Sequence, residues 1–75
     1  MYKFQEVKDL LYMETKWIKF KSLSSDKVHQ HLVTIPKDYQ NHSDKIIVWE
    51  CENKHWMDIE VETIISIKEH YEIIQ

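Results

Sequence analysis

The chain has no glycine, no alanine and no arginine, and it contains a single proline, Pro36, and a single cysteine, Cys51. The absence of glycine excludes the phosphate-cradling loops of Walker and dinucleotide-binding motifs, and it leaves asparagine, aspartate, serine and lysine to form the turns. A lone cysteine excludes an internal disulfide, the usual support of small secreted domains. The scarce residue types are those encoded by GC-rich codons, so the composition indicates an AT-rich genome, such as that of a low-GC bacterium or one of its phages.

Long hydrophobic runs are also missing. No stretch approaches the roughly 20 apolar residues that cross a bilayer, and charges interrupt residues 1–9, so we expect no signal peptide. A chain of 75 residues has the length of one domain. We therefore expect a single domain over residues 1–75, located in the cytoplasm of a bacterial host cell.

The charge is unevenly distributed along the chain. Residues 1–45 carry eight lysines and six acids, whereas residues 46–75 carry two lysines and seven acids, and the formal net charge is −3. An acidic chain without arginine is a poor candidate for binding duplex DNA, since basic residues neutralise phosphates and arginine reads guanine. The acidic half predicts either a solvated surface or a surface for a basic partner.

Hydrophobic periodicity predicts one helix followed by strands. Phe4, Val7, Leu10 and Leu11 follow helical spacing, which predicts a short amphipathic helix over about residues 4–13. From residue 15 the period changes to two, and a polar loop over 39–44 and a tail over 69–75 interrupt or follow the strands. The expected strands are 16–21, 28–35, 45–52, 55–61 and 63–68.

This pattern predicts a mainly β fold, a small five-stranded barrel over about residues 15–68 with a short N-terminal helix. The hairpin turn at residues 52–54 is expected to place Asn53 in the left-handed conformation. The alternation of the strands and the helix pattern together predict the core. Its expected members are Leu10, Leu11, Ile18, Phe20, Val33, Ile35, Ile47, Trp49, Ile59, Val61, Ile65 and Ile67.

Five segments follow one another in a recognisable order: Ile-Lys-Phe-Lys at 18–21, a polar turn at 24–28, Ile-Ile-Val-Trp-Glu at 46–50, Trp-Met-Asp-Ile-Glu-Val at 56–61 and Ile-Ile-Ser-Ile at 64–67. Over residues 17–68 the chain resembles the short WYL-like family, which is frequent in phages. The resemblance implies an SH3/Sm-like β-barrel.

Two departures from that family concern function. Ser25 or Asp26 replaces the turn glycine, and Met57 and Glu60 replace the arginines of the tryptophan-containing strand. In larger relatives these basic positions are associated with nucleic-acid or nucleotide binding. The corresponding surface is acidic here, so the resemblance carries the fold but not that ligand.

A metal site is one interpretation of the histidines. His29 and His31 lie two residues apart in an expected strand, so their rings share one face, and His42, His55 or Cys51 could supply a third zinc ligand. No further spaced pair completes a recognisable site. We therefore expect two histidines on the solvent face of a strand, and no metal or other cofactor.

Nucleophilic or acid–base catalysis is not expected either. Cys51 lies between Glu50 and Glu52, which raise a thiol pKa, and its position predicts a buried structural thiol. Catalytic carboxylates need a pocket that separates their pKa values, whereas the carboxylates of the fourth expected strand lie about 7 Å apart along an exposed face. These carboxylates are Asp58, Glu60 and Glu62. The chain is predicted not to be an enzyme.

The three tryptophans are the strongest indication of function. Trp49 alternates with the residues expected in the core, so we expect its side chain to be buried. Trp17 shares a strand face with lysines, and Trp56 shares a strand face with acids. An exposed tryptophan beside charge is typical of a protein-binding hot spot. The alternative is that the helix and the tail cover both outer tryptophans.

These observations predict a small non-catalytic phage or mobile-element protein that binds and inhibits or redirects a host protein, such as a nucleic-acid-handling or defence protein. The predicted binding residues are Trp56, Asp58, Glu60, Glu62 and Trp17. The alternative is a nucleotide or single-stranded nucleic-acid binder that uses Trp17 with Lys19 and Lys21. A subunit of an Sm-like ring is a third possibility, because exposed edge strands can pair between copies.

Overall fold

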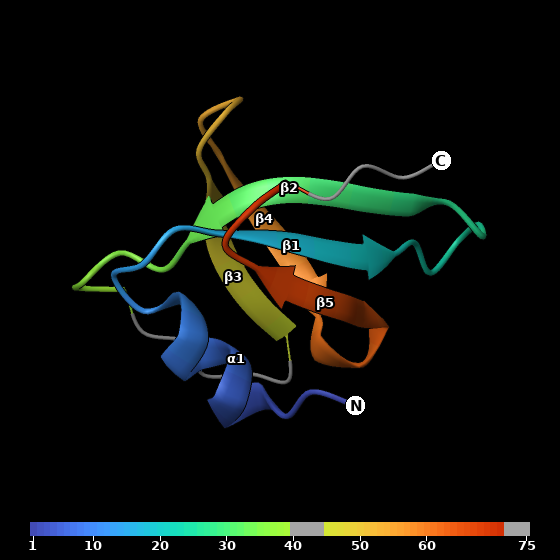
Figure 1. Ribbon diagram of the computed structural model, residues 1–75, viewed down its shortest axis with the longest axis horizontal. Helices are drawn as coiled ribbons and strands as arrows, with labels where there is room; N and C mark the ends of the chain where they lie inside the picture. Colours follow the sequence, from blue (N-terminus) through green and yellow to red (C-terminus); the bar gives the residue numbers. More distant parts are fainter. Residues whose placement is uncertain (40–44, 72–75) are drawn as a thin grey trace.

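The computed structural model describes residues 1–39 and 45–71 (Figure 1). It contains one helix, five strands and one 3₁₀ turn. The expected helix and all five expected strands are confirmed, with ends that differ by at most two residues. The expected loop at 39–44 and tail at 69–75 fall partly on residues 40–44 and 72–75, which lie outside the described residues. The elements are α1 (Phe4–Leu11), β1 (Lys16–Lys21), β2 (Val28–Thr34), β3 (Lys45–Glu50), β4 (His55–Glu60), η1 (Val61–Thr63) and β5 (Ile64–Lys68).

The strands form one antiparallel sheet in the order β4-β3-β2-β1-β5. The expectation of a closed barrel is wrong, because β4 and β5 are both edge strands, separated by η1, and do not pair. The centre of the sheet is also narrow: β2 pairs with β3 at Val33–Glu50 and Thr34–Trp49, and the N–H of Cys51, directly after β3, donates to the Leu32 carbonyl at 2.8 Å. This short seam divides the sheet into a β2-β1-β5 half and a β3-β4 half, which cross each other in Figure 1.

The hydrophobic core fills the inner side between the two halves, and α1 packs against β3 at one end. The backbone N–H of Ile35 donates to the carbonyl of Leu11 at 2.9 Å, and that of Met13 donates to the carbonyl of Ile35 at 2.8 Å. These bonds attach the C-terminal end of the helix to the end of β2. The buried apolar residues are Val7, Leu11, Ile18, Val33, Ile35, Ile46, Val48, Ile59 and Ile64.

The core prediction is confirmed in one part and wrong in another. Buried as expected are Leu11, Ile18, Val33, Ile35 and Ile59, and Phe20, Val61 and Ile67 pack against them while partly exposed. In β3 the expected face is reversed. Ile46 and Val48 point inward, while Ile47 and Trp49 are only half-buried. Both faces of this strand are apolar, so alternation alone cannot identify the buried face. The register with β4 determines it, because Ile46 pairs with the buried Ile59.

Two further predicted core residues are exposed. Leu10 lies near the end of a helix that stops at Leu11, so its side chain falls outside the buried stripe. In β5 the pairing with β1 shifts between Lys19 and Phe20. Because a bulge moves the following side chains to the opposite face, Ile64 becomes buried and Ile65 is exposed.

The β3–β4 turn forms without glycine. Lys54, rather than the expected Asn53, takes the left-handed conformation, with φ of 56°. A left-handed non-glycine residue costs roughly 1–2 kcal/mol. We expect Lys54→Gly to raise the free energy of unfolding by about 1 kcal/mol in urea denaturation. Asn53→Gly is the matched control and should not stabilise the protein; equal stabilisation by both variants would contradict the assignment.

No helix among the described residues is both long and apolar enough to cross a membrane.

Candidate functional site

An aromatic cluster lies on the outer side of the β3-β4 half, and one of its rings, Tyr39, also packs against the hydrophobic core. Trp49 and Trp56 pair across the two strands and meet edge to face, with ring centroids 5.2 Å apart. The Tyr39 ring lies 4.9 Å from that of Trp56. Trp56 is 48% exposed, whereas Trp49 and Tyr39 are half-buried. Trp49 and Tyr39 therefore support one side of the Trp56 ring, and its remaining surface faces solvent.

An acidic pair, Asp58 and Glu60, continues the same face of β4. Lys45 on β3 lies 3.9 Å from Asp58 and 3.8 Å from Glu60. Two carboxylates share this one lysine, Lys45 and Asp58 are more than half exposed and Glu60 is about one-third exposed, so the attraction within the group is weak. The acidic pair keeps an excess negative charge beside Trp56.

The other two predicted binding residues lie elsewhere. Glu62 belongs to η1 rather than to β4, so it does not continue the stripe. Trp17 lies on β1 and contacts Tyr71, with ring centroids 4.9 Å apart in an edge-to-face arrangement. The segment after β5 thus covers part of Trp17. The structure brings Trp56, Asp58 and Glu60 together and separates Trp17 and Glu62 from them.

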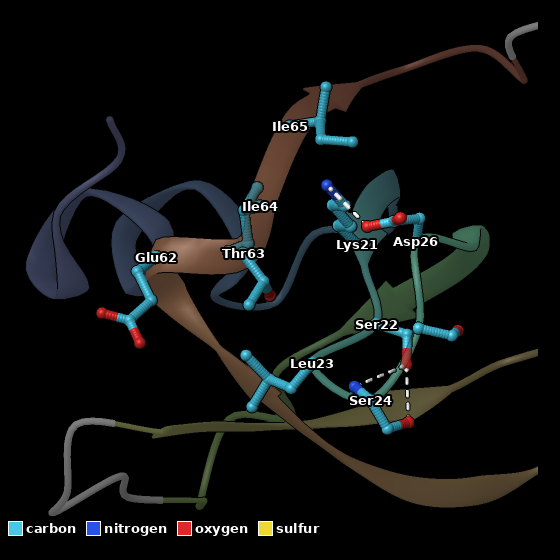
Figure 2. A pocket seen from close by; sticks show the side chains of 10 residues that line it. Lys21, Ser22, Leu23, Ser24, Asp26, Glu62, Thr63, Ile64 and Ile65 are labelled. Carbon is cyan, nitrogen blue, oxygen red and sulfur yellow. Dashed lines mark hydrogen bonds and ion pairs between the residues drawn. The ribbon is translucent and has the colours of Figure 1, made fainter.

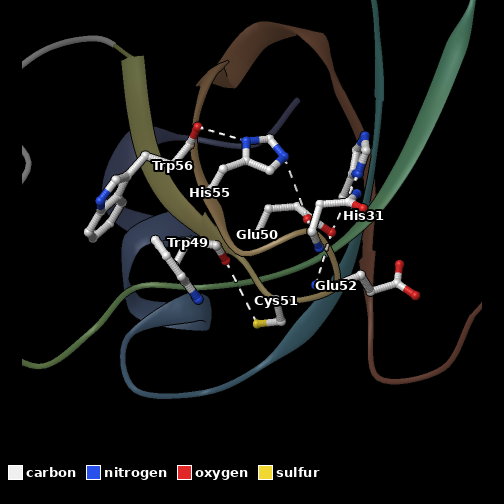
Figure 3. A network of polar contacts seen from close by, with 8 residues as sticks. His31, Trp49, Glu50, Cys51, Glu52, His55 and Trp56 are labelled. Carbon is white, nitrogen blue, oxygen red and sulfur yellow. Dashed lines mark hydrogen bonds and ion pairs between the residues drawn. The ribbon is translucent and has the colours of Figure 1, made fainter.

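A buried carboxylate lies on the inner face at the β2–β3 seam (Figure 3). Glu50 is fully buried and accepts hydrogen bonds from the backbone N–H groups of Asn53, at 2.6 Å, and Glu52, at 3.3 Å. His31 Nδ1 lies 3.7 Å from one carboxylate oxygen and His55 Nε2 lies 3.6 Å from the other. Glu50 therefore connects β2, β4 and the hairpin turn.

The expectation that His29 and His31 occupy a solvent face is wrong. His29 pairs with Phe20 and His31 pairs with Ile18, so both rings share the inner face of the sheet and are half-buried. The His29 and His31 rings stack at 6.3 Å, and that of Phe20 lies 5.6 Å from His29. In β2, His29 and His31 alternate with the same period as Val33, which is buried. Their spacing from Val33 therefore indicates that both histidines lie on the inner face.

The surroundings of Glu50 determine its charge. Burial alone would raise its pKa, but the hydrogen bonds from Asn53 and Glu52 and the nearby His31 and His55 together hold the pKa below its ordinary value of 4.5. A carboxyl with a lowered folded-state pKa stabilises the protein above its unfolded-state pKa, and this stabilisation is lost as the pH falls through the folded-state pKa.

A pH titration of stability should detect this carboxylate. We expect the free energy of unfolding to fall as the pH is lowered below about 4.5, and Glu50→Gln to remove part of that decrease, because glutamine does not titrate. The difference between the two proteins, measured by urea denaturation at several pH values, isolates Glu50 from the other acids. A difference that stays constant from pH 7 to pH 2 would contradict this assignment.

The thiol and the histidines give little support to catalysis or metal binding. Cys51 lies in the hairpin turn, half-buried, rather than in the strand, and its Sγ approaches the Trp49 carbonyl at 3.8 Å. Burial and the neighbouring Glu50 and Glu52 raise the pKa of this thiol, so less of it is in the nucleophilic thiolate form at neutral pH. Within residues 1–39 and 45–71 no group of three or more side chains is arranged to hold a metal ion; His42 lies outside the described residues.

Two open grooves flank the turn between β1 and β2. The larger, of about 700 Å³, lies between this turn and η1–β5 (Figure 2). Its polar groups include Ser22 and Ser24, with hydroxyls 3.2 Å apart, and the exposed ion pair of Lys21 and Asp26 at 3.2 Å. The smaller, of about 260 Å³, lies between the turn and β4. Leu23 contributes to both grooves.

No protein-family model, curated protein or solved structure matches this chain. The fold defines a class: a small antiparallel five-stranded sheet with an N-terminal helix. Its outer face carries an aromatic cluster of which sequence analysis identified only Trp56 as a binding residue. Trp49 was missed because its strand is apolar on both faces, and Tyr39 because it is remote in sequence.

Proposed function

We propose that the protein is a binding module that docks on a partner protein with a basic surface through the outer face of β3 and β4. The observation that carries this proposal is Trp56, which is almost half exposed, supported by two aromatic rings and followed on its strand by Asp58 and Glu60. Such a residue contributes a large apolar area at a low entropy cost, because its neighbours already restrict it.

The acidic pair gives the proposed surface its selectivity. Charges at the rim of an interface accelerate the encounter with an oppositely charged partner more than they increase affinity. The anchor and the steering charges thus lie on one strand, and that strand is at the edge of the sheet.

The biological origin and the cellular role of the protein are further parts of the proposal. The five antiparallel strands agree in number with the small β fold that the resemblance to the WYL-like family implies over residues 17–68, while the sheet stays open between β4 and β5. Together with the AT-rich composition, this supports a phage or mobile-element protein that inhibits or redirects a host protein, such as a nucleic-acid-handling or defence protein.

Capture from a bacterial lysate tests the proposal. Tagged wild-type protein should retain one protein in stoichiometric amount, and the Trp17→Ala variant should retain it equally well. Trp56→Ala should retain much less of it, because it lacks the anchor. Capture that does not depend on Trp56, or no stoichiometric capture at all, would contradict the proposed surface.

A second candidate function has its own observation. The outer face of β1 carries Trp17 against Tyr71, with Lys19 on the same face and Lys68 paired opposite Trp17. Aromatic rings beside lysines are typical of single-stranded nucleic-acid binding. Titration of oligothymidylate and of cyclic nucleotides against tryptophan fluorescence tests this. Quenching that weakens with salt and is lost in Trp17→Ala would favour this alternative.

A further inference from the structure

We propose that the outer edge of β4 binds an extended segment of the partner in which arginine residues alternate with small residues. This inference rests on the proposed function and specifies the chemistry of the partner. Three features of β4 support it: its place at the edge of the sheet, the order Trp56, Asp58, Glu60 on its outer face, and the charge of that face.

The edge position provides a backbone for pairing. β4 pairs along its full length with β3 on one side, and no other described strand pairs with it on the other. A strand with one neighbour presents a row of backbone donors and acceptors, which an extended peptide can use by adding a strand to the sheet. An added strand would place its alternate side chains on the same outer face as Trp56.

The spacing of the side chains on that face determines which positions of the partner segment must be basic. Trp56, Asp58 and Glu60 lie at every second residue, about 7 Å apart along the strand. In paired strands, directly opposite side chains approach to about 5 Å. A basic residue at every second position can therefore lie beside Trp56, Asp58 and Glu60 in turn, whereas consecutive basic residues would place half of their charges on the inner face.

The chemistry of the three positions favours arginine over lysine. A guanidinium is planar and stacks on an indole, and it donates two parallel hydrogen bonds to one carboxylate. The exposed surface of Trp56 offers the platform, and Asp58 and Glu60 offer the carboxylates. Lys45 already lies 3.9 Å and 3.8 Å from these carboxylates, which shows that the acidic pair accepts a cation while its charge is only partly neutralised.

Labelled peptides test the inference by fluorescence anisotropy at roughly 0.1 M salt, near the ionic strength of the cell. The probe is Thr-Arg-Thr-Arg-Thr-Arg-Thr. The comparison peptides replace arginine with lysine, replace it with uncharged citrulline, or place all the arginines consecutively. We expect the probe to bind about threefold more tightly than the lysine peptide, about fivefold more tightly than the consecutive peptide and at least about tenfold more tightly than the citrulline peptide.

A variant pair assigns the binding to β4. Asp58→Asn should weaken binding of the probe about fivefold, because it removes a charge-assisted pair. Glu52→Gln removes another exposed negative charge, in the hairpin turn, and should change binding less than twofold. Both variants should show the circular dichroism spectrum and thermal unfolding of the wild type.

Three results would overturn the inference: affinities within twofold for the probe and the consecutive peptide, affinities within twofold for the probe and the citrulline peptide, or equal effects of Asp58→Asn and Glu52→Gln. Failure of the proposed function can be distinguished from failure of this inference. If no arginine peptide binds while capture of a lysate protein still requires Trp56, only the alternating arginine segment is wrong. If capture does not require Trp56 either, the proposed surface is wrong as well.

Discussion

Replacing Glu50 with glutamine should lower the free energy of unfolding by about 2 kcal/mol. The carboxylate is fully buried, and both of its oxygens accept backbone N–H groups of the hairpin turn. Glutamine has nearly the same shape but only one acceptor oxygen. Its amide group would therefore turn a donor toward another donor and leave one backbone N–H without a partner.

The consequences are large because Glu50 lies at the narrowest part of the sheet. Two residue pairs and the hydrogen bond from the Cys51 N–H to the Leu32 carbonyl connect β2 to the end of β3. Glu50 belongs to one of these pairs, and its carboxylate faces His31 on β2 and His55 on β4. A domain of this size has a total stability of roughly 4–11 kcal/mol. The substitution therefore removes a substantial fraction of the free energy of unfolding.

Urea denaturation at pH 7 measures this effect, and Glu52→Gln is the matched control. Glu52 is exposed, so its substitution should change the free energy of unfolding by less than about 0.5 kcal/mol. A Glu50→Gln variant as stable as the Glu52→Gln variant would show that the buried carboxylate is not required for the seam.

Replacing Trp56 with alanine should weaken binding of the partner by at least about 2 kcal/mol, or roughly 30-fold, with the fold intact. Its ring contacts Tyr39 and Trp49 on the outer face and is absent from the core cluster. Stability should therefore fall by only about 1 kcal/mol, mainly from lost aromatic contacts.

Calorimetry with the captured partner and thermal unfolding of the free protein separate these two effects. Trp17→Ala removes a half-buried tryptophan with one aromatic contact from the other half of the sheet and should leave the affinity unchanged. If Trp56→Ala unfolds the domain, the residue is part of the core instead of the binding surface.

Charge reversal addresses the acidic pair independently of the anchor. Changing Asp58 and Glu60 together to lysine should mainly slow association and flatten its dependence on salt, since rim charges steer the encounter. Stopped-flow mixing at several salt concentrations measures this. Unchanged association rates would mean that the acidic pair is only a solvated strand face.

Local sequence patterns alone locate the helix and the strands and identify the buried face of several strands. In β1, Ile18 and Phe20 alternate with Trp17 and two lysines, so only one face can be buried, and the correct one was predicted. The same holds for β4, where the charges around Trp56 required an exposed face. Alternation of apolar and charged side chains is a property of a single strand, and it can be recognised without knowledge of any neighbour.

Features that depend on a neighbouring strand follow only from the packing of the elements against one another. The apolar strand β3 could bury either face until its pairing with β4 directed Val48 and Glu50 inward. The histidines of β2 received their inner position from pairing with Phe20 and Ile18. Tyr39 joined the aromatic cluster across a long sequence separation. A shift of one residue in register exchanges the two faces of a strand, and register is set by side chains on other strands.

Closure of the sheet was decided in the same way. Five strands and their turns are equally compatible with an open sheet and a barrel; the difference lies in whether β4 meets β5. The 3₁₀ turn of Val61–Thr63 separates these strands, while the β1–β5 bulge and the two-pair seam set the path of the sheet. Each of these features depends on the pairing and twist of several strands together. It is this open arrangement that leaves β4, with Trp56 on its outer face, as an edge.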